Sequence, residues 1–264
     1  ADHTGGIAYL HAESIAEIAQ DLPKHLPESR RSDLGKRHFE TVLAPLLNLY
    51  FQTASFHDAV RMLVQQEHGL NAMALVRPQL EGLVTLLYLL QDGSSLPEVE
   101  KKVAEYQEWI QIKQWVNSQR SKGLSLLEIA PEHNDYLRQV EENYLRISDR
   151  YDGRSRDLKR LEKSQSFVPN KPSVARAAGF EDLYRHIVAE CSASIHVADY
   201  GDRMTPSTIK DFVGYRFRIR SRKDTTWPLV LSNLVLLHSV AGLSKFLEID
   251  HAILPALLAT IDNE

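Results

Sequence analysis

The sequence has only one cysteine among its 264 residues. A single thiol excludes a disulfide framework and a metal cage made of thiolates alone, and it favours a reducing compartment. The first residues also lack the order of basic, apolar and small segments that marks a secretory signal. We therefore expect a cytoplasmic protein, and we expect no metal and no cofactor.

Neither sign of charge dominates, because 31 Lys and Arg residues face 35 Asp and Glu residues, for a net charge of −4. This balance gives no global attraction to nucleic acid or to an anionic membrane. Glycine and proline are scarce, at 12 and 11 residues, and 43% of the chain is hydrophobic. Such a composition excludes a disordered or collagen-like chain. The length predicts a single globular domain over residues 1–264.

Apolar residues recur at spacings of three and four along most of the chain, which predicts an all-α bundle of about eight helices. The expected helices cover residues 6–20, 32–64, 70–90, 96–116, 137–151, 180–197, 227–247 and 252–261. Pro45 should kink the second of them, and Gly69 should mark its end. A capping box at Ser95 and Glu98 should open the fourth. The polar stretch 152–173 predicts a long surface loop.

Residues 70–90 form a helix that is apolar all round, so it should lie inside the protein, because Leu80–Leu90 is too short to cross a bilayer. Arg77 and Glu81 interrupt this helix one turn apart, where they can pair. A buried charge is costly without a partner. The pair is therefore either an internal salt bridge or part of a pocket in which Arg77 presents its fork to a carboxylate or phosphate.

A second polar group comprises Tyr184, Ser192, Ser194 and His196. His196 follows Ser192 by four residues, so their side chains can touch on one helical face. The histidine is either a core residue satisfied by a hydroxyl or a general base beside a serine. No Gly-x-Ser-x-Gly turn presents such a serine. The catalytic candidates are His196, Ser192 and Arg77. His186 and Glu190 have the spacing of two metal ligands, but no second pair matches them.

These two groups resemble the hallmarks of a family. Arg77-Pro78-x-x-Glu81 ahead of the apolar run 83–90, and Tyr184 followed by Ser192 and His196, are similar to the bacterial domain-of-unknown-function family numbered 5677. The resemblance covers about residues 35–245. It implies an all-helical bacterial domain in which the two motif helices lie together, and it implies no activity. Ser194 leaves open which serine pairs with the histidine.

Helical domains with arginine and histidine invite comparison with HEPN ribonucleases, in which Arg-x(4–6)-His holds phosphate and moves protons. Arg31 with His38, and Arg61 with His68, have this spacing. A motif this loose is expected about twice by chance in such a chain, so it carries no information by itself. Arg61 and His68 stay candidates because they should share a helical face with His57.

A short basic strip alternates with apolar residues between 214 and 222, which predicts an extended segment with one basic face. Its arginines are Arg216, Arg218, Arg220 and Arg222. The strip either contacts nucleic-acid phosphates, with Tyr215 and Phe217 stacking on bases, or is a solvated edge that discourages strand pairing. Basic residues of the loop 152–173 would extend the same surface.

Two functions follow from these residues. The first is a non-catalytic binding or regulatory module whose cluster of Arg77, Glu81, Tyr184, Ser192, Ser194 and His196 is buried and is structural or holds a small anion. The alternative is a HEPN-like, metal-independent ribonuclease or toxin of a prokaryotic defence system. The apolar helices 70–90 and 227–247 favour a homodimer weakly. No membrane partner is expected.

Overall fold

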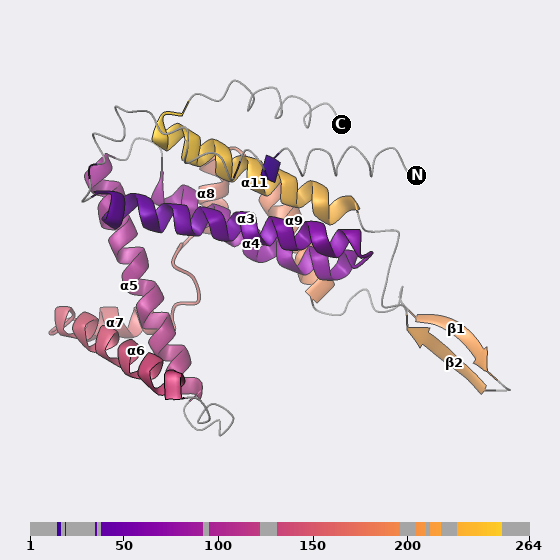
Figure 1. Ribbon diagram of the computed structural model, residues 1–264, viewed down its shortest axis with the longest axis horizontal. Coiled ribbons are helices and arrows are strands. Elements are labelled where there is room, and N and C mark those ends of the chain that lie inside the picture. The colour runs from indigo at the N-terminus through magenta and orange to yellow at the C-terminus, as the bar shows by residue number, and fades with distance from the viewer. Residues whose placement is uncertain are drawn as a thin grey trace. The chain divides into compact units, whose positions relative to one another are not determined.

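The protein is described here by a computed structural model (Figure 1). It describes residues 15, 16, 19, 35, 38–91, 95–121, 131–195, 204–209, 212–217 and 226–249. For residues 131–133, 193–195, 204–209 and 212–217 it describes the backbone alone. The expected helix at 252–261 lies outside these ranges, as does nearly all of the expected helix at 6–20.

The described part of the chain is a multi-helix, all-α fold, as predicted. Its helices are the π-helix Phe39–Leu43, α3 (Ala44–Gln65), α4 (Gly69–Leu89), α5 (Leu96–Ser121), α6 (Pro131–Arg150), α7 (Ser155–Lys163), α8 (Lys171–Ala177), α9 (Glu181–Ile195) and α11 (Thr226–Leu247). One antiparallel hairpin accompanies them, made of β1 (Met204–Ile209) and β2 (Phe212–Phe217). The chain divides into two compact units, residues 1–93 with 170–264, and residues 94–169. The prediction of a single domain stays a prediction.

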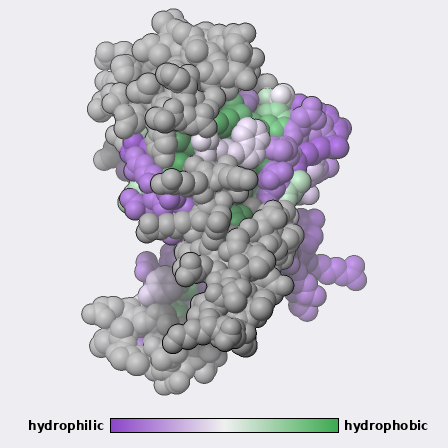
Figure 2. All heavy atoms as spheres, turned by 90° about the vertical axis from the view of Figure 1, so that its right-hand side faces the viewer, coloured by the Kyte–Doolittle hydropathy of each residue, from purple (hydrophilic) through white to green (hydrophobic). Residues whose placement is uncertain are grey.

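In the first unit, α3, α4 and α11 pack against one another, and α9 packs against α4 (Figure 1). Leu80 and Leu83 of α4 and Leu229 of α11 are fully buried. Each such side chain contributes about 1.5–3 kcal/mol through the apolar surface it removes from water. A Cβ on Gly82 would lie 2.7 Å from Thr53 Oγ1, so α4 approaches α3 closely at this point. The view in Figure 2 shows hydrophobic side chains between hydrophilic ones on one face of the molecule.

Among the described residues, α11 alone is long and apolar enough to cross a membrane by length and composition. Within the protein, 61% of its most apolar window is buried. The helix packs on α3 and α4.

A buried polar network joins these three helices through His57 of α3, Gln79 of α4 and Ser232 of α11. The Ser232 hydroxyl donates to Gln79 Oε1 at 2.7 Å, and Gln79 Nε2 donates to the Ser232 carbonyl at 3.0 Å. His57 Nδ1 lies 2.9 Å from Ser232 Oγ. Since the single hydroxyl hydrogen goes to Gln79, Nδ1 carries the hydrogen and donates to Ser232. The network therefore sets the register of three helices and the tautomer of the histidine.

Three local expectations differ from the structure. The expected continuous helix 32–64 changes type before Pro45, which lies in the first turn of α3 directly after the π-helix; the kink at Pro45 stays a prediction. The α3–α4 turn has its left-handed residue at Glu67, with φ of 61°, and α4 already begins at Gly69. The expected loop 152–173 was wrong, because it holds α7 and the start of α8. These helices are short and contain few apolar residues, so their apolar pattern is brief.

The second unit packs α5 against α6 and α7. The capping box is confirmed in part, since Glu98 Oε2 accepts from the Ser95 amide at 2.7 Å and α5 begins at Leu96. Trp115 of α5 stacks on Tyr144 of α6, with ring centroids 3.6 Å apart. The Tyr144 hydroxyl donates to the carboxylate of Glu162 on α7. These contacts hold the three helices together with aromatic and hydrogen-bonded pairs.

We predict that Ser232→Ala destabilises the protein more than Ser239→Ala. Both serines are fully buried on α11, but the Ser239 hydroxyl donates only to the Val235 carbonyl of its own helix. Ser232→Ala removes the hydrogen bonds of His57 Nδ1 and of Gln79 Oε1 to the serine hydroxyl, and a buried polar atom that loses its bond costs about 1–3 kcal/mol. Ser239→Ala should cost less than about 1 kcal/mol. Urea unfolding measures both, and equal losses would contradict the role of the network.

Candidate functional site

Arg77 and Glu81 pair on α4 as predicted, with Arg77 Nε 3.6 Å from Glu81 Oε1. The expected burial of this pair was wrong, because the two side chains are 37% and 46% exposed. The packing of α4 explains the difference. Its buried residues face its helical neighbours, whereas a row through Ala74, Arg77, Glu81, Thr85 and Tyr88 is only partly covered. The pair lies on this open row, where water relieves the cost of its charges.

Lys171, which sequence reasoning missed, is a second cation beside Glu81. Its Nζ lies 3.2 Å from Glu81 Oε1, so Glu81 lies between two cations. Lys171 is the first residue of α8, and Asn170 caps this helix by accepting from the Ser173 amide at 3.2 Å. An asparagine followed by a proline at 172 is a helix-start signal that could have predicted α8.

Arg77 also reaches α9. Its Nη1 donates to Ser192 Oγ over 3.5 Å, a long contact that brings the two motif helices together as the resemblance implies. Ser194 lies on α9, but its side chain is outside the described part, and so is all of His196. Whether His196 reaches Arg77, and which serine it pairs with, stay predictions.

Tyr184 of α9 lies near the same charges. Its pKa is raised, first by burial and then by the Glu81 carboxylate, while Arg77 opposes the rise. The hydroxyl therefore keeps its proton at neutral pH and is a hydrogen-bond donor. We call the group formed by these side chains the Arg77 cluster; it consists of Arg77, Glu81, Lys171, Tyr184 and Ser192.

Cys191 anchors α9 beside the Arg77 cluster. Its buried thiol donates to the Met73 carbonyl at 3.2 Å, one turn before Arg77. Burial raises the pKa of this thiol to about 11, which Arg77 partly offsets. At neutral pH the group is protonated and is not a nucleophile. Its contribution is to hold α9 against α4, and so to hold Ser192 near Arg77.

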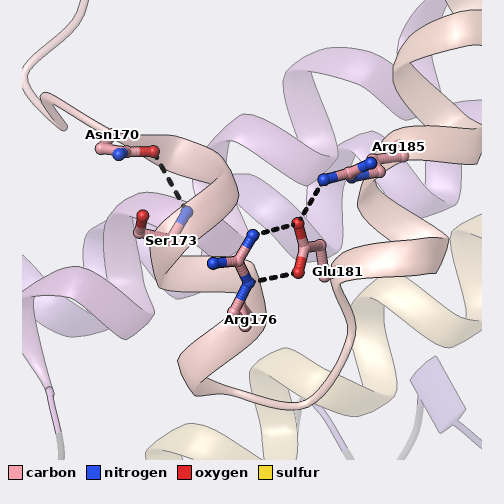
Figure 3. A network of polar contacts seen from close by, with 5 residues as sticks. All are labelled: Asn170, Ser173, Arg176, Glu181 and Arg185. Atoms are coloured by element: carbon pink, nitrogen blue, oxygen red, sulfur yellow. Dashed lines mark hydrogen bonds and ion pairs between the residues drawn. The ribbon is translucent and has the colours of Figure 1, made fainter.

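The corner between α8 and α9 is fixed by Glu181, the first residue of α9 (Figure 3). Its carboxylate accepts from Arg176 of α8 at 2.5 and 2.8 Å and from Arg185 of α9 at 2.7 Å. The bidentate Arg176 pair is the strong geometry for an arginine and a carboxylate. This corner places Lys171, at the other end of α8, near α4.

The basic strip falls largely outside the described residues. Arg216 lies on β2, where its backbone is paired with Thr205 of β1, so the expected extended segment is confirmed over 214–217. β1 was not expected. Arg218, Arg220 and Arg222 lie outside the described part of the chain. β2 pairs with β1 on one side, and both interpretations of the strip, as a nucleic-acid contact or as a solvated edge, stay predictions.

The pair Arg61 and His68 does not share a helix, so the expected common face with His57 was wrong. α3 ends at Gln65, and His68 precedes the first residue of α4. Arg61 pairs with Asp58 at 3.5 Å, while His57 belongs to the buried network. Arg31 lies outside the described residues. Among those described, no three His, Cys, Asp or Glu side chains gather as metal ligands; the His186 ring contacts Trp227 instead.

We predict that the contacts of Glu181 make the free energy of unfolding fall as the pH is lowered. Hydrogen bonds from Arg176, and then from Arg185, lower the pKa of Glu181 from 4.5 to about 2. The stabilisation is therefore full above about pH 4.5 and is lost as the pH falls toward about 2. Asp182, the next residue, has no such partner among the described residues and is the matched control. The urea midpoint of Glu181→Gln should approach that of the wild type between about pH 5 and 2, whereas Asp182→Asn, which keeps the contacts of Glu181, should lose stability with acid as the wild type does. Parallel curves for both variants would contradict this account.

Comparison with known proteins gives one family. A model for a family of unknown function, DUF5677, matches residues 43–201, which is more than half of the chain. No curated protein and no solved structure matches the chain. The matched region includes both motifs, from Arg77 to His196, and it is shorter at both ends than the similarity expected from the sequence. The chain therefore belongs to the DUF5677 family.

Proposed function

We propose that the protein is a non-catalytic binding module that holds a small anion, a carboxylate or a phosphate, at the Arg77 cluster. The observation that carries the proposal is the convergence of Arg77 and Lys171 from two helices on one partly exposed spot. The cluster contains two cations and one carboxylate, so its formal charge is positive. A positive, partly open site attracts anions from water.

The donors of Arg77 are only loosely used. Its contacts with Glu81 and Ser192 are 3.6 and 3.5 Å long, whereas a charged arginine pair in good geometry is about 2.7–2.9 Å. A guanidinium has five N–H donors in a planar fork. The fork can therefore give a bidentate grip to an incoming carboxylate or phosphate without breaking a strong bond.

Two hydroxyls add neutral donors to the same spot. Ser192 accepts from Arg77, which leaves its own hydrogen to donate. Tyr184 stays protonated because its pKa is raised. A small anion would receive a guanidinium, an ammonium and two hydroxyls. This donor set suits a terminal carboxylate or a phosphate monoester better than a neutral ligand.

Titration calorimetry with inorganic phosphate at low ionic strength tests the proposal. We expect Arg77→Gln and Lys171→Gln each to weaken binding about tenfold, since a hydrogen bond to a charged group contributes about 1.5–3 kcal/mol. Arg185→Gln is the matched control, because Arg185 of α9 also pairs with a glutamate four residues away on its own helix. It should leave the affinity unchanged.

The variant Glu81→Gln distinguishes an anion-binding site from a salt bridge that only stabilises the fold. Removing this carboxylate takes away the one negative charge of the cluster, so phosphate should bind more tightly. A structural salt bridge predicts no phosphate binding in any variant, only lower stability. Absence of binding by the wild type, or equal weakening in Arg185→Gln, would overturn the proposal.

The alternative is a metal-independent ribonuclease of the HEPN type. It is favoured by the contact between Arg77 and Ser192, since His196 follows that serine by four residues. Purified protein, a labelled single-stranded RNA and a chelator provide the test. Our proposal expects no cleavage. Cleavage that is lost in His196→Ala and kept in His186→Ala, with both variants folded, would replace the binding module by the ribonuclease.

A further inference from the structure

Helix α7 presents a face of one charge sign. Its basic residues are Arg156, Lys159, Arg160 and Lys163, and all four are exposed. At about 100° per residue they fall within an arc of roughly 100°. Their spacing therefore places every cation of the nine-residue helix on the same side.

The opposite side of α7 contacts α5 and α6. Leu158 and Leu161 are partly buried, and α7 packs on α5. The Glu162 carboxylate accepts from the Tyr144 hydroxyl of α6, and the Glu162 carbonyl accepts from Lys113 of α5. Of the two acidic residues of α7, Glu162 is thus turned toward α6 and α5, and Asp157 of the first turn forms no ion pair with the four cations among the described residues.

The four cations have no ion-pair partner among the described residues. In contrast, Arg150 pairs with Glu108 at 3.2 Å, and Arg154 donates to the Arg150 carbonyl and lies 4.8 Å from the centre of the Tyr151 ring. The face is also not a result of overall charge, because residues 94–169 contain 13 basic and 13 acidic residues. The four positive charges repel one another, so a polyanion that neutralises them would bind favourably at this face.

We propose that the basic face of α7 binds the sugar–phosphate backbone of a nucleic acid, independently of base sequence. From Arg156 to Lys163 the face extends about 10 Å along the helix, which matches roughly three phosphates of one strand. Two of the four cations are arginines, whose fork fits phosphate oxygens. A membrane is the weaker partner, since an interfacial helix needs a free apolar face and α7 turns its leucines inward.

Fluorescence anisotropy with a labelled single-stranded RNA of about 20 nucleotides tests the proposal. The variant Lys159→Gln/Arg160→Gln removes two contacts and is compared with Lys101→Gln/Arg138→Gln, which removes the same charge from exposed positions on α5 and α6. Each phosphate contact with a single strand contributes about 0.7 to the slope of log K against log salt concentration. The first variant loses two contacts, so this slope should fall by about 1.4 and the affinity near 0.1 M salt by about 25-fold. The second should behave as the wild type.

Two further titrations test whether the partner is a nucleic acid, a membrane or another polyanion. Vesicles containing phosphatidylserine and poly-glutamate are titrated under the same conditions as the RNA. The proposal is overturned if the wild type does not bind RNA, if both variants lose affinity equally, or if vesicles or poly-glutamate bind as tightly as RNA. Circular dichroism of both variants checks that α7 and its neighbours are folded.

Discussion

The packing of α4 is the constraint on which the first unit depends. This helix contacts α3, α11 and α9, and ten of its 21 residues are buried. Helices that pack on several sides leave at most a narrow open row, and in α4 this row contains Arg77 and Glu81. Because the row is open, the ion pair keeps part of its water and escapes the full desolvation cost of a buried pair. Because the row adjoins α8 and α9, the same side chains meet Lys171 and Ser192.

The buried network supports this arrangement from the opposite side of α4. Gln79 is bound to Ser232 and is fully buried, whereas Arg77, two residues earlier, is partly exposed. Residues two apart on a helix point in different directions. Fixing the rotation of α4 through Gln79 therefore also fixes where Arg77 points. A satisfied polar network restricts a packed helix to one rotation more strictly than apolar contacts do.

The sequence predicted the parts of the fold that depend on local patterns. α4 and α11 were found because their apolar residues continue over about twenty positions. α7 and α8 were missed because they are short, bury little and contain few apolar residues. The pairing of Arg77 with Glu81 was predictable from a spacing of four, but its exposure was not, since only tertiary packing decides which row of α4 stays open. The contact of Lys171 with Glu81, and that of His57 with Ser232, 175 residues away, left no local signal.

The placement of the carboxylates separates three arrangements of the same residue types. Glu181 receives three short hydrogen bonds from two arginines, so donors of both arginines are already used to join α8 to α9. Glu81 lies between Arg77 and Lys171 at longer distances, so it holds both cations in place and still leaves their donors available. On α7, Glu162 bonds to Tyr144, and the four cations have no carboxylate partner in the described part of the chain. The first arrangement, at Glu181, is a structural clamp. The second, at Glu81, is the site that we propose for a small anion, and the third, on α7, is the surface that we propose for a polyanion. Counting arginines and glutamates in the sequence does not distinguish the three, because the difference is in how far each carboxylate is committed to its partners.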